Sequence, residues 1–336
     1  MGIPLALIGL GDHMYSRLYP LVLSREFDLA AICDRDEARL ARFAGRYAAR
    51  RLYTDLETML NETKPAAVIC AGPARLHYEA ARACMLRGIS PFVEKTPCET
   101  ADQALELYGL EQKTGCFTMT GFNRRFATAY MLAKEIADSP GFGAPLMYTA
   151  KYNASPYASR EYFLFNHVIH HLDIARFFLG DITSISTDMR VLGGREVCCH
   201  IRFFTATGAM GFIQSACVGC ESYPMERVEI TGRAGNIIID NVKDLSYNRN
   251  AEARQGPLPA SLGQETDCLR WNINHGHSSL YGHYGFEREL DIYLACIAED
   301  RRPPLTFADT AQTMLLYERL LENIVEMKVD ACNFPS

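Results

Sequence analysis

The stretch Pro4–Gly11, which reads PLALIGLG, decides the fold. Its first five residues form an apolar run without alternation, which is typical of a strand buried on both faces in a parallel sheet. The run ends at Gly9 and Gly11, and a helical segment follows. In the dinucleotide-binding fingerprint the first glycine makes a tight turn, and the second lets the backbone approach a pyrophosphate. We therefore expect a nucleotide-binding strand and helix at the start of the chain, with Asp12 and His13 beside the ligand.

The next strand carries an acidic residue where this fingerprint needs one. Met14 stands at the position of the third small residue, so the glycine pattern by itself is incomplete. The apolar run 27–33 ends at Asp34, 23 positions after the second glycine, where a carboxylate would hold the ribose hydroxyls. Asp34 would repel a 2′-phosphate, which favours NAD, whereas the guanidinium of Arg35 keeps NADP open. The alternative role of Asp34 is to cap the helix that starts near Asp36, and this role is compatible with ligand binding.

Buried strands and helices alternate along the first third of the chain. Such alternation predicts a doubly wound parallel sheet. Ligands on such a sheet bind beyond the carboxyl ends of its strands. We expect one cofactor-binding crevice to be formed there by Gly9, Gly11, Asp12, His13, Met14, Asp34, Ala71, Gly72, Pro73, Glu94, Lys95 and Asn123.

A lysine stands at the exit of one of these strands, in the stretch Pro91–Pro97 (PFVEKTP). An apolar strand runs into Glu94 and Lys95 and stops at a proline. A lysine at this place can reach a ligand while its stem stays packed. The alternative is a solvated charge at a strand end. The choice depends on whether the nucleotide-binding pattern before it and a histidine-bearing helix after it belong to the same site.

The pattern changes after about residue 140. Sequential strand-like runs separated by Gly-rich turns predict a mostly antiparallel sheet. The region 251–285 is rich in Gly, Pro, His and Asn and is expected to be an irregular loop, followed by helices over 286–299 and 308–327. We expect an α/β domain with a doubly wound parallel sheet over residues 1–122. A second, α+β domain is expected over 123–336, with its last helix able to pack back on the first.

A histidine-bearing helix is predicted over residues 166–179. At 100° per residue, its apolar positions 168, 172, 175 and 179 share one face. Asn166, His170 and Asp173 cluster on the opposite side. A solvated face is the alternative, but solvated faces are usually rich in Lys and Glu. A histidine flanked at i−4 and i+3 by hydrogen-bonding groups is better suited to proton transfer.

Composition indicates an ordinary globular protein. The chain has 336 residues, of which 48% are hydrophobic and 22% charged, with a net charge of −6. This charge gives no support to binding of nucleic acid or of an anionic membrane. The first apolar run is too short and too interrupted by glycine for a signal peptide or a membrane span, so the protein is expected in the cytoplasm.

The twelve cysteines are expected to be reduced. Most stand in apolar strings, where a thiol behaves as a small core residue. Cys217 and Cys220 form a Cys-x-x-Cys without a second pair, and in a strand their side chains would face opposite ways. His275, His277 and His283 lack an obvious carboxylate or thiol partner and stay unassigned. We expect no metal.

These motifs together resemble the glucose-fructose oxidoreductase / inositol dehydrogenase (Gfo/Idh/MocA) family over nearly the whole chain. The resemblance rests on the glycine turn at residues 9–11, Pro73 followed by His77, Glu94–Pro97, the stretch GFNRRF at 121–126, and His170–Asp173. It implies an N-terminal Rossmann domain and a C-terminal domain with an open antiparallel sheet. The exposed face of that sheet would serve a homo-oligomer, either a dimer or a tetramer. The resemblance also adds His77 to the cofactor-binding residues.

By this resemblance Lys95 matches the family's catalytic lysine and His170 its catalytic histidine, while the family's acidic residue four positions earlier falls on Asn166. The function implied is hydride transfer between a secondary alcohol of a sugar, cyclitol or glycoside and NAD. His170 would take the hydroxyl proton, and Lys95 would stabilise the developing negative charge. Asn166 cannot take a proton, so either Asp173 assumes part of that role or the relay is simpler.

The expected substrate pocket contains Lys95, His170 and Asp173, with aromatic residues such as Tyr152, Tyr157 and Phe163 to suit a polyhydroxylated ring. Two other functions stay open. One is a glycosidase that oxidises the sugar transiently with NAD and shows no net redox change. The other is a non-catalytic regulator that binds dinucleotide or sugar, for which Asn166 is the only hint.

Overall fold

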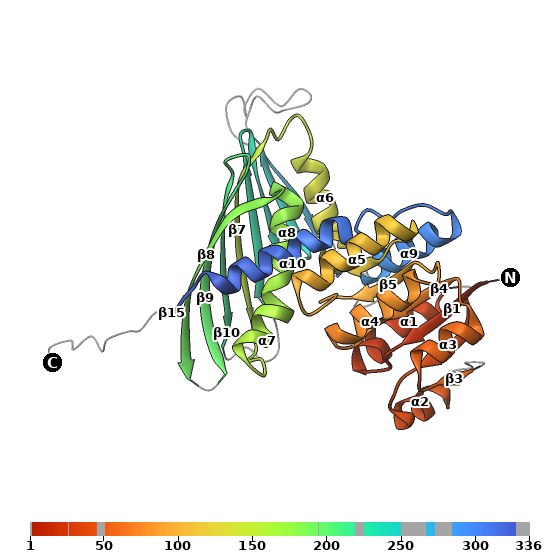
Figure 1. The fold of residues 1–336 in the computed structure, drawn as a ribbon. Coiled ribbons are helices and arrows are strands. Elements are labelled where there is room, and N and C mark those ends of the chain that lie inside the picture. Colours follow the sequence, from red (N-terminus) through yellow and green to blue (C-terminus); the bar gives the residue numbers. More distant parts are fainter. Residues whose placement is uncertain are drawn as a thin grey trace. The chain divides into compact units, whose positions relative to one another are not determined.

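The chain folds into two compact units. The computed structural model describes residues 2–25, 27–45, 51–193, 195–218, 225–249, 267–272 and 284–326 (Figure 1). The first unit comprises Met1–Phe126 and Ser279–Leu315, and the second comprises Ala127–Ser278 and Leu316–Ser336.

The first unit is built on a parallel sheet of six strands in the order β3-β2-β1-β4-β5-β6. This is the strand order of a dinucleotide-binding doubly wound fold, with the topological switch point between β1 and β4. The apolar runs form strands because both faces of the sheet are covered. Their bounds are β1 (Ile3–Ile8), β2 (Phe27–Cys33), β3 (Leu52–Tyr53), β4 (Ala67–Cys70), β5 (Pro91–Glu94) and β6 (Met119–Gly121).

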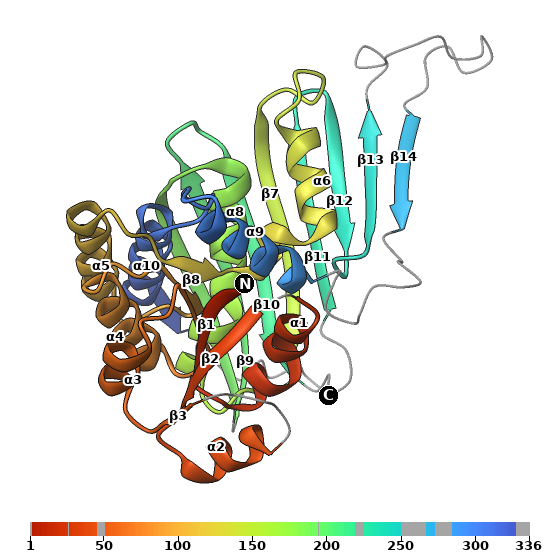
Figure 2. The same ribbon diagram turned by 90° about the vertical axis from the view of Figure 1, so that its right-hand side faces the viewer.

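Helices cover both faces of this sheet. Figure 2 shows α3, α4 and α5 on one side of the strands and α1 on the other. Asp36, Asp55 and Thr100 accept backbone N–H groups at the starts of α2, α3 and α5, which is why these helices begin there. The helical segments are η1 (Met14–Leu18), α1 (Tyr19–Leu23), α2 (Glu37–Ala44), α3 (Leu56–Thr63), α4 (Ala74–Met85), α5 (Ala101–Thr114), η2 (Asn123–Phe126) and α9 (Phe286–Ala298).

The segment Ser279–Leu315 belongs to the first unit, whereas the sequence placed residues 123–336 in the second domain and expected only the last helix to pack back on the first. The reason lies in α9. The Tyr293 hydroxyl is hydrogen-bonded to the backbone of Val68 at 3.0 Å and to the Ser90 carbonyl oxygen at 2.9 Å, in the interior of the parallel sheet. These contacts join residues more than 200 positions apart, so no local sequence pattern predicts them.

The second unit is built on a nine-stranded sheet in the order β14-β13-β12-β11-β7-β10-β9-β8-β15. The pairs β7–β10 and β8–β15 are parallel and the other pairs are antiparallel, so the prediction of a mostly antiparallel sheet is confirmed. The bounds are β7 (Pro145–Ala154), β8 (Ile182–Gly193), β9 (Glu196–Thr205), β10 (Met210–Cys217), β11 (Met225–Gly232), β12 (Gly235–Asp240), β13 (Asp244–Arg249), β14 (Asp267–Asn272) and β15 (Ile324–Glu326).

Figure 1 shows α6 (Thr128–Ala137) and α8 (Ile169–Leu179) on the same face of this sheet. Along β9, Ile201 and Phe203 are buried while Arg202 and Phe204 are exposed, so the opposite face stays open to solvent. Two further helical segments, α7 (Arg160–Phe163) and η3 (Leu164–Val168), precede α8. The last helix, α10 (Phe307–Glu322), contains the boundary between the two units.

Several sequence predictions were wrong in detail. The region 251–285, which was expected to be an irregular loop, contains β14. The helix expected from Asn166 begins as the π-helical turn η3, which becomes α-helical at Ile169. Among the described residues, none of the helices is both long and apolar enough to cross a membrane.

The ten cysteines in the described part of the chain carry free thiols, and eight of them are buried. Burial raises the pKa of Cys33 and of Cys199 to about 12, as expected of core thiols. Cys220 and the three histidines His275, His277 and His283 lie outside the described residues, so the structure does not bear on them.

Candidate cofactor-binding and catalytic site

The two glycines of the first turn have different structural demands. Gly9 has a φ of 78°, and a Cβ there would lie 2.2 Å from the Ala71 carbonyl oxygen, so this position requires glycine for the fold itself. A Cβ at Gly11 would meet no protein atom within 4 Å. The open space above Gly11 is what a fingerprint glycine leaves for a pyrophosphate, so the turn fits the dinucleotide that the pattern predicts.

Exchanging each glycine for alanine should separate these demands. Gly9→Ala is expected to destabilise the first unit strongly, because a left-handed φ and a backbone clash coincide there. Gly11→Ala is expected to keep the melting temperature and to raise the Kd for NAD at least about tenfold, since the added methyl group occupies ligand space. Calorimetry of unfolding and of NAD binding checks both. Equal loss of stability in the two variants would contradict the assignment.

The three residues after Gly11 differ in exposure. The Asp12 side chain is fully exposed and lies 3.8 Å from the Arg42 guanidinium. Met14 is fully buried, so its side chain fills the core and has no surface to offer a cofactor. It opens the π-helical turn η1, in place of the small residue that the fingerprint has there.

Asp34 binds the glycine turn from the next strand. One carboxylate oxygen accepts the Leu10 N–H at 2.6 Å, and the other accepts the Asp36 N–H at 2.9 Å. The cap of α2 is Asp36 and not Asp34, so the capping alternative is wrong. Since each carboxylate oxygen can accept a second bond, Asp34 can hold the glycine turn and a ribose hydroxyl together. Arg35 beside it is exposed.

The preference for NAD over NADP should depend on the charge of Asp34. Asp34→Asn keeps an oxygen for the Leu10 N–H and removes the negative charge. We expect it to weaken NAD binding and to shift the ratio of the two dissociation constants towards NADP, because a 2′-phosphate is no longer repelled. Titration of both cofactors measures the ratio. An unchanged ratio would remove Asp34 from the ribose site.

His77 acts inside the fold. The Gly72 N–H donates to its Nε2 at 2.8 Å, so Nδ1 carries the proton and donates to the Thr96 carbonyl oxygen at 2.8 Å. Burial lowers the pKa of His77 to about 4, which keeps the ring neutral. Both ring nitrogens are thus occupied by backbone groups. The geometry gives His77 a positioning role between the loop after β4, where Gly72 and Pro73 are exposed, and the chain that follows Lys95.

Glu94 and Lys95 end strand β5 at the edge where the glycine turn lies. Glu94 Oε1 is 3.0 Å from His13 Nε2, and Glu94 Oε2 accepts the Lys95 backbone N–H at 3.2 Å. Burial raises the pKa of Glu94, but His13, with Lys95 and His77, outweighs it and holds the pKa below its usual value. The cofactor-edge residues His13, Glu94 and Lys95 therefore form one connected cluster.

Lys95 has a perturbed pKa. Its side chain keeps partial exposure, yet desolvation lowers its pKa to about 8; Glu94 opposes this shift and Arg124 adds to it. An amine whose pKa lies near neutrality, beside specific charged neighbours, is a candidate for proton or oxyanion chemistry. The sequence did not single out Arg124, although it lies in the motif GFNRRF.

Asn123 is buried in η2 and donates from its amide to the Tyr284 carbonyl oxygen at 2.8 Å. It lies directly after β6, at the carboxyl end of that strand, as the sequence predicted. The same edge of the parallel sheet thus carries Gly11, Asp34, Gly72, Lys95 and Asn123.

In the second unit, α8 carries the predicted proton-transfer residues. His170 and Asp173 are both buried. Asn166 is half-buried in η3, where its amide donates to the Tyr162 carbonyl oxygen at 3.2 Å. A π-helical turn inside a helix is often found at functional sites, and here it directly precedes His170.

The aromatic residues assigned to the substrate pocket pack mainly around His167. The Tyr152 ring stacks on the His167 ring at 3.5 Å between centroids, and the buried Phe163 ring lies 5.3 Å from the same histidine. The Tyr157 hydroxyl lies 3.2 Å from His167 Nδ1. The structure thus packs these rings around a partner that the sequence did not predict, because residue type and spacing do not reveal which neighbour a ring contacts.

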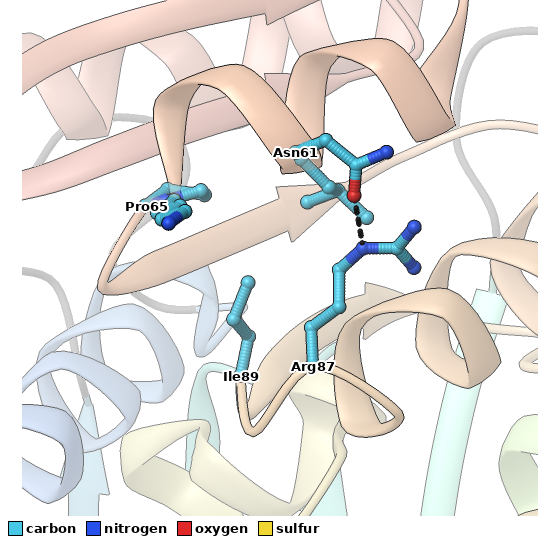
Figure 3. A pocket seen from close by; sticks show the side chains of 6 residues that line it. Asn61, Pro65, Arg87 and Ile89 are labelled. Atoms are coloured by element: carbon cyan, nitrogen blue, oxygen red, sulfur yellow. Dashed lines mark hydrogen bonds between the residues drawn. The ribbon is translucent and has the colours of Figure 1, made fainter.

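A cavity of about 510 Å³ lies at the other edge of the parallel sheet. Its lining residues precede β4 and β5 in the chain, so they lie at the amino ends of these strands. Figure 3 shows the Arg87 guanidinium donating to the Asn61 side chain, at 2.9 Å. Cofactors on parallel sheets bind at the carboxyl ends, so we do not assign the cavity to NAD. It is lined by Leu60, Asn61, Lys64, Pro65, Arg87 and Ile89.

Comparison with known families agrees with this geometry. Residues 3–122 match a family described as an oxidoreductase family with an NAD-binding Rossmann fold, and residues 130–238 match the GFO/IDH/MocA C-terminal domain. The first match covers the parallel sheet with its glycine turn, Asp34 and Lys95. The second covers α8 and most of the antiparallel sheet. NAD is therefore the cofactor of the first unit.

Individual relatives are dehydrogenases. Myo-inositol 2-dehydrogenase of Thermotoga maritima is 26% identical over 257 residues, which are 71% of this chain and 76% of that protein. D-apiose dehydrogenase of Paraburkholderia graminis is 23% identical over 328 residues, 93% of this chain and 85% of that one.

Solved structures share the fold. A dehydrogenase from Chromobacterium violaceum superposes with a TM-score of 0.85 at 22% identity, covering 96% of this chain and 95% of that one. Levoglucosan dehydrogenase in complex with NADH and levoglucosan superposes with a TM-score of 0.81 at 18% identity, covering 96% and 97%.

Proposed function

The chain belongs to the Gfo/Idh/MocA family of oxidoreductases, and from that premise we propose that it transfers hydride between a secondary alcohol of a sugar, cyclitol or glycoside and NAD. The observation that carries this proposal is Lys95, an amine with a pKa of about 8 that follows a strand of the NAD-binding sheet. The names of the relatives, an inositol and an apiose dehydrogenase among them, support the substrate class.

The proposed chemistry divides between two residues. The Lys95 ammonium hydrogen-bonds the reacting hydroxyl oxygen and stabilises the negative charge that develops on it. His170 accepts the hydroxyl proton as general base. NAD, when bound, supplies the acceptor for the hydride of the alcohol carbon. When a ketone is reduced, the proton and the hydride move in the opposite directions.

Asn166 and Asp173 complete the proposed proton path. An amide can orient a hydroxyl but cannot take a proton, so Asn166 is proposed to position the substrate. Asp173 stands one helical turn after His170 on the same helix. It is the carboxylate available on α8 to stabilise the imidazolium that forms at His170.

A coupled assay tests the function. The purified protein is incubated with NAD or NADP and with inositols, sugars and simple glycosides, while reduced nicotinamide and released aglycone are followed together. Reduced cofactor that accumulates with one polyol class supports the proposal and identifies that class. Aglycone release without net reduction of NAD would contradict the proposal and indicate the glycosidase instead. If neither reduced nicotinamide nor aglycone appears although NAD binds tightly, the non-catalytic regulator is favoured.

We also propose a homo-oligomer in the cytoplasm, formed through the open face of the second sheet. Phe204, Met210 and Met147 are register partners on the adjacent strands β9, β10 and β7, and all three side chains are exposed. An exposed row of apolar side chains of this kind is typical of an interaction surface. Light scattering that returns the mass of a single chain would refute the oligomer.

A further inference from the structure

Glu289, on helix α9, is a buried carboxyl group that the chemistry above does not use. It has no exposed surface, and neither carboxyl oxygen has a hydrogen-bond partner among the residues that the structure describes. Isolated buried carboxylates are very costly, because burial removes their hydration without replacing it. A group in this position therefore needs an explanation beyond packing.

The contacts of α9 show where Glu289 lies. One turn before it, the Phe286 ring contacts the His13 ring at 5.6 Å between centroids. One turn after it, Tyr293 contacts Phe92 of β5 at 5.7 Å and bonds to the sheet backbone. Residues three and four apart share a helix face. The Glu289 side chain thus lies on the face of α9 that spans from the glycine turn to strand β5.

Glu94 points to the same place from the sheet. Residues two apart on a strand face the same way, so Glu94 projects on the side where Phe92 meets Tyr293. A Cβ on Gly121 of the neighbouring strand β6 would lie 3.0 Å from both Glu94 Oε2 and the Phe92 ring, which confirms that the two side chains share a face. The His13 ring links α9 to Glu94, since it contacts Phe286 and binds Glu94.

We propose that Glu289 is a proton-bearing positioning residue, held as a neutral carboxylic acid beside Glu94 so that Glu94 alone of the pair carries the negative charge that binds His13 and attracts the Lys95 ammonium. Two adjacent buried carboxyl groups cannot both ionise, because neither has water to screen the repulsion. Burial raises the pKa of Glu289 well above its usual value, and the charge of Glu94 raises it further.

The charged groups around α9 support a neutral Glu289 beside a negatively charged Glu94. Glu287 and Asp291, on its exposed side, lie 3.8 Å and 2.5 Å from the Arg25 guanidinium. Arg125 of η2 is 2.6 Å from Asp309. The other charged groups on α9 and on the elements packed against it are Arg17 of η1, His13, Glu94, Lys95, Arg124 of η2 and Arg288. Of all these groups, Glu94 is the one that shifts the pKa of Glu289.

The pH dependence of unfolding tests the proposal. A glutamate that is neutral in the folded chain and ionised in the unfolded chain makes unfolding more favourable as pH rises. The unfolding constant of the wild type, relative to that of Glu289→Gln, should therefore rise roughly tenfold per pH unit between about pH 5.5 and 7.5. Urea unfolding is followed by far-ultraviolet circular dichroism, because the single tryptophan, Trp271, lies in the second unit.

A matched control removes the same charge from the same helix. Glu287→Gln lies on the exposed side of α9, and its unfolding constant should keep a constant ratio to that of the wild type across this range. A constant ratio for Glu289→Gln as well would mean that Glu289 is ionised in the fold, and it would overturn the proposal. If Glu289→Gln does not fold, Glu289→Met, of similar length and without an ionisable group, takes its place.

An infrared measurement on the folded chain needs no unfolding. At pH 7 the carbonyl stretch of a protonated carboxylic acid should be present in the wild type and in Glu287→Gln, and should lose intensity in Glu289→Gln. Burial also raises the pKa of Glu111, so the difference between variants, and not the band itself, identifies Glu289. A spectrum unchanged by Glu289→Gln would overturn the proposal. The inference rests on the proposed function of Lys95, but both tests measure protonation, so the two can fail independently.

Discussion

Turnover is expected to fall at least about a hundredfold when Lys95 is replaced by alanine, in line with the loss of a positioned oxyanion-stabilising group. The effect should lie in kcat, because the ammonium acts on charge that develops during the reaction and less on the bound substrate. Steady-state kinetics with the best polyol from the coupled assay measure it. NAD binding should persist, because Gly11 and Asp34 are untouched.

Two variants sharpen this prediction. Lys64→Ala removes an exposed lysine at the opposite edge of the same sheet and should leave turnover unchanged. Arg124→Gln removes a cation that lowers the pKa of Lys95. The pKa of Lys95 should then rise. In the wild type, turnover should fall as pH rises through about 8, because Lys95 loses its proton and no longer stabilises the developing negative charge, and in Arg124→Gln this fall should move to higher pH. Near-normal turnover in Lys95→Ala would exclude the lysine from the chemistry.

His170→Ala is expected to lower turnover by at least about a hundredfold as well, because a general base typically contributes two to four powers of ten. His170→Asn keeps a polar side chain without a basic nitrogen and should be equally slow. A normal turnover of His170→Ala would contradict the assignment of His170 as the general base and would point to Asp173 instead.

The neighbouring histidine provides the control. His171 is fully buried, and its Nδ1 lies 2.7 Å from the Tyr148 hydroxyl. His171→Ala should cost about 1–3 kcal/mol of stability, because a buried hydroxyl loses its partner. Its kcat should fall far less than that of His170→Ala at a temperature where both variants are folded. This contrast separates the role of His170 from the stability of α8.

Local sequence was enough for the architecture of the first unit. A parallel strand buried on both faces must be apolar throughout, so Leu5–Ile8 and Ala67–Cys70 are recognisable from composition. The glycines, Asp34 and Lys95 could be found because each stands directly at a strand end. The carboxyl ends of parallel strands share one edge, so sequence position alone brings these residues together.

The roles of individual side chains depended on distant contacts. His77 was expected to contact the cofactor, yet Gly72 and Thr96 occupy both of its ring nitrogens. The ring of Tyr152, which is expected in the substrate pocket, stacks on His167, a partner that the sequence did not predict. In each case the partner is close in space and cannot be chosen from residue type, because a histidine or tyrosine has the same hydrogen-bonding groups in either role.

The sequence by itself therefore determined the fold class, the family, and the edge of the sheet that carries the residues proposed to bind NAD. These depend on periodicity and on residues that directly follow strands, and both are properties of neighbouring residues. Only the tertiary structure decided the pKa of Lys95, the burial of Glu289 within the influence of the Glu94 charge, and the membership of α9 in the first unit. Burial and charge at a point are sums over residues far apart in the chain, so they exist only once α9 has packed against the sheet.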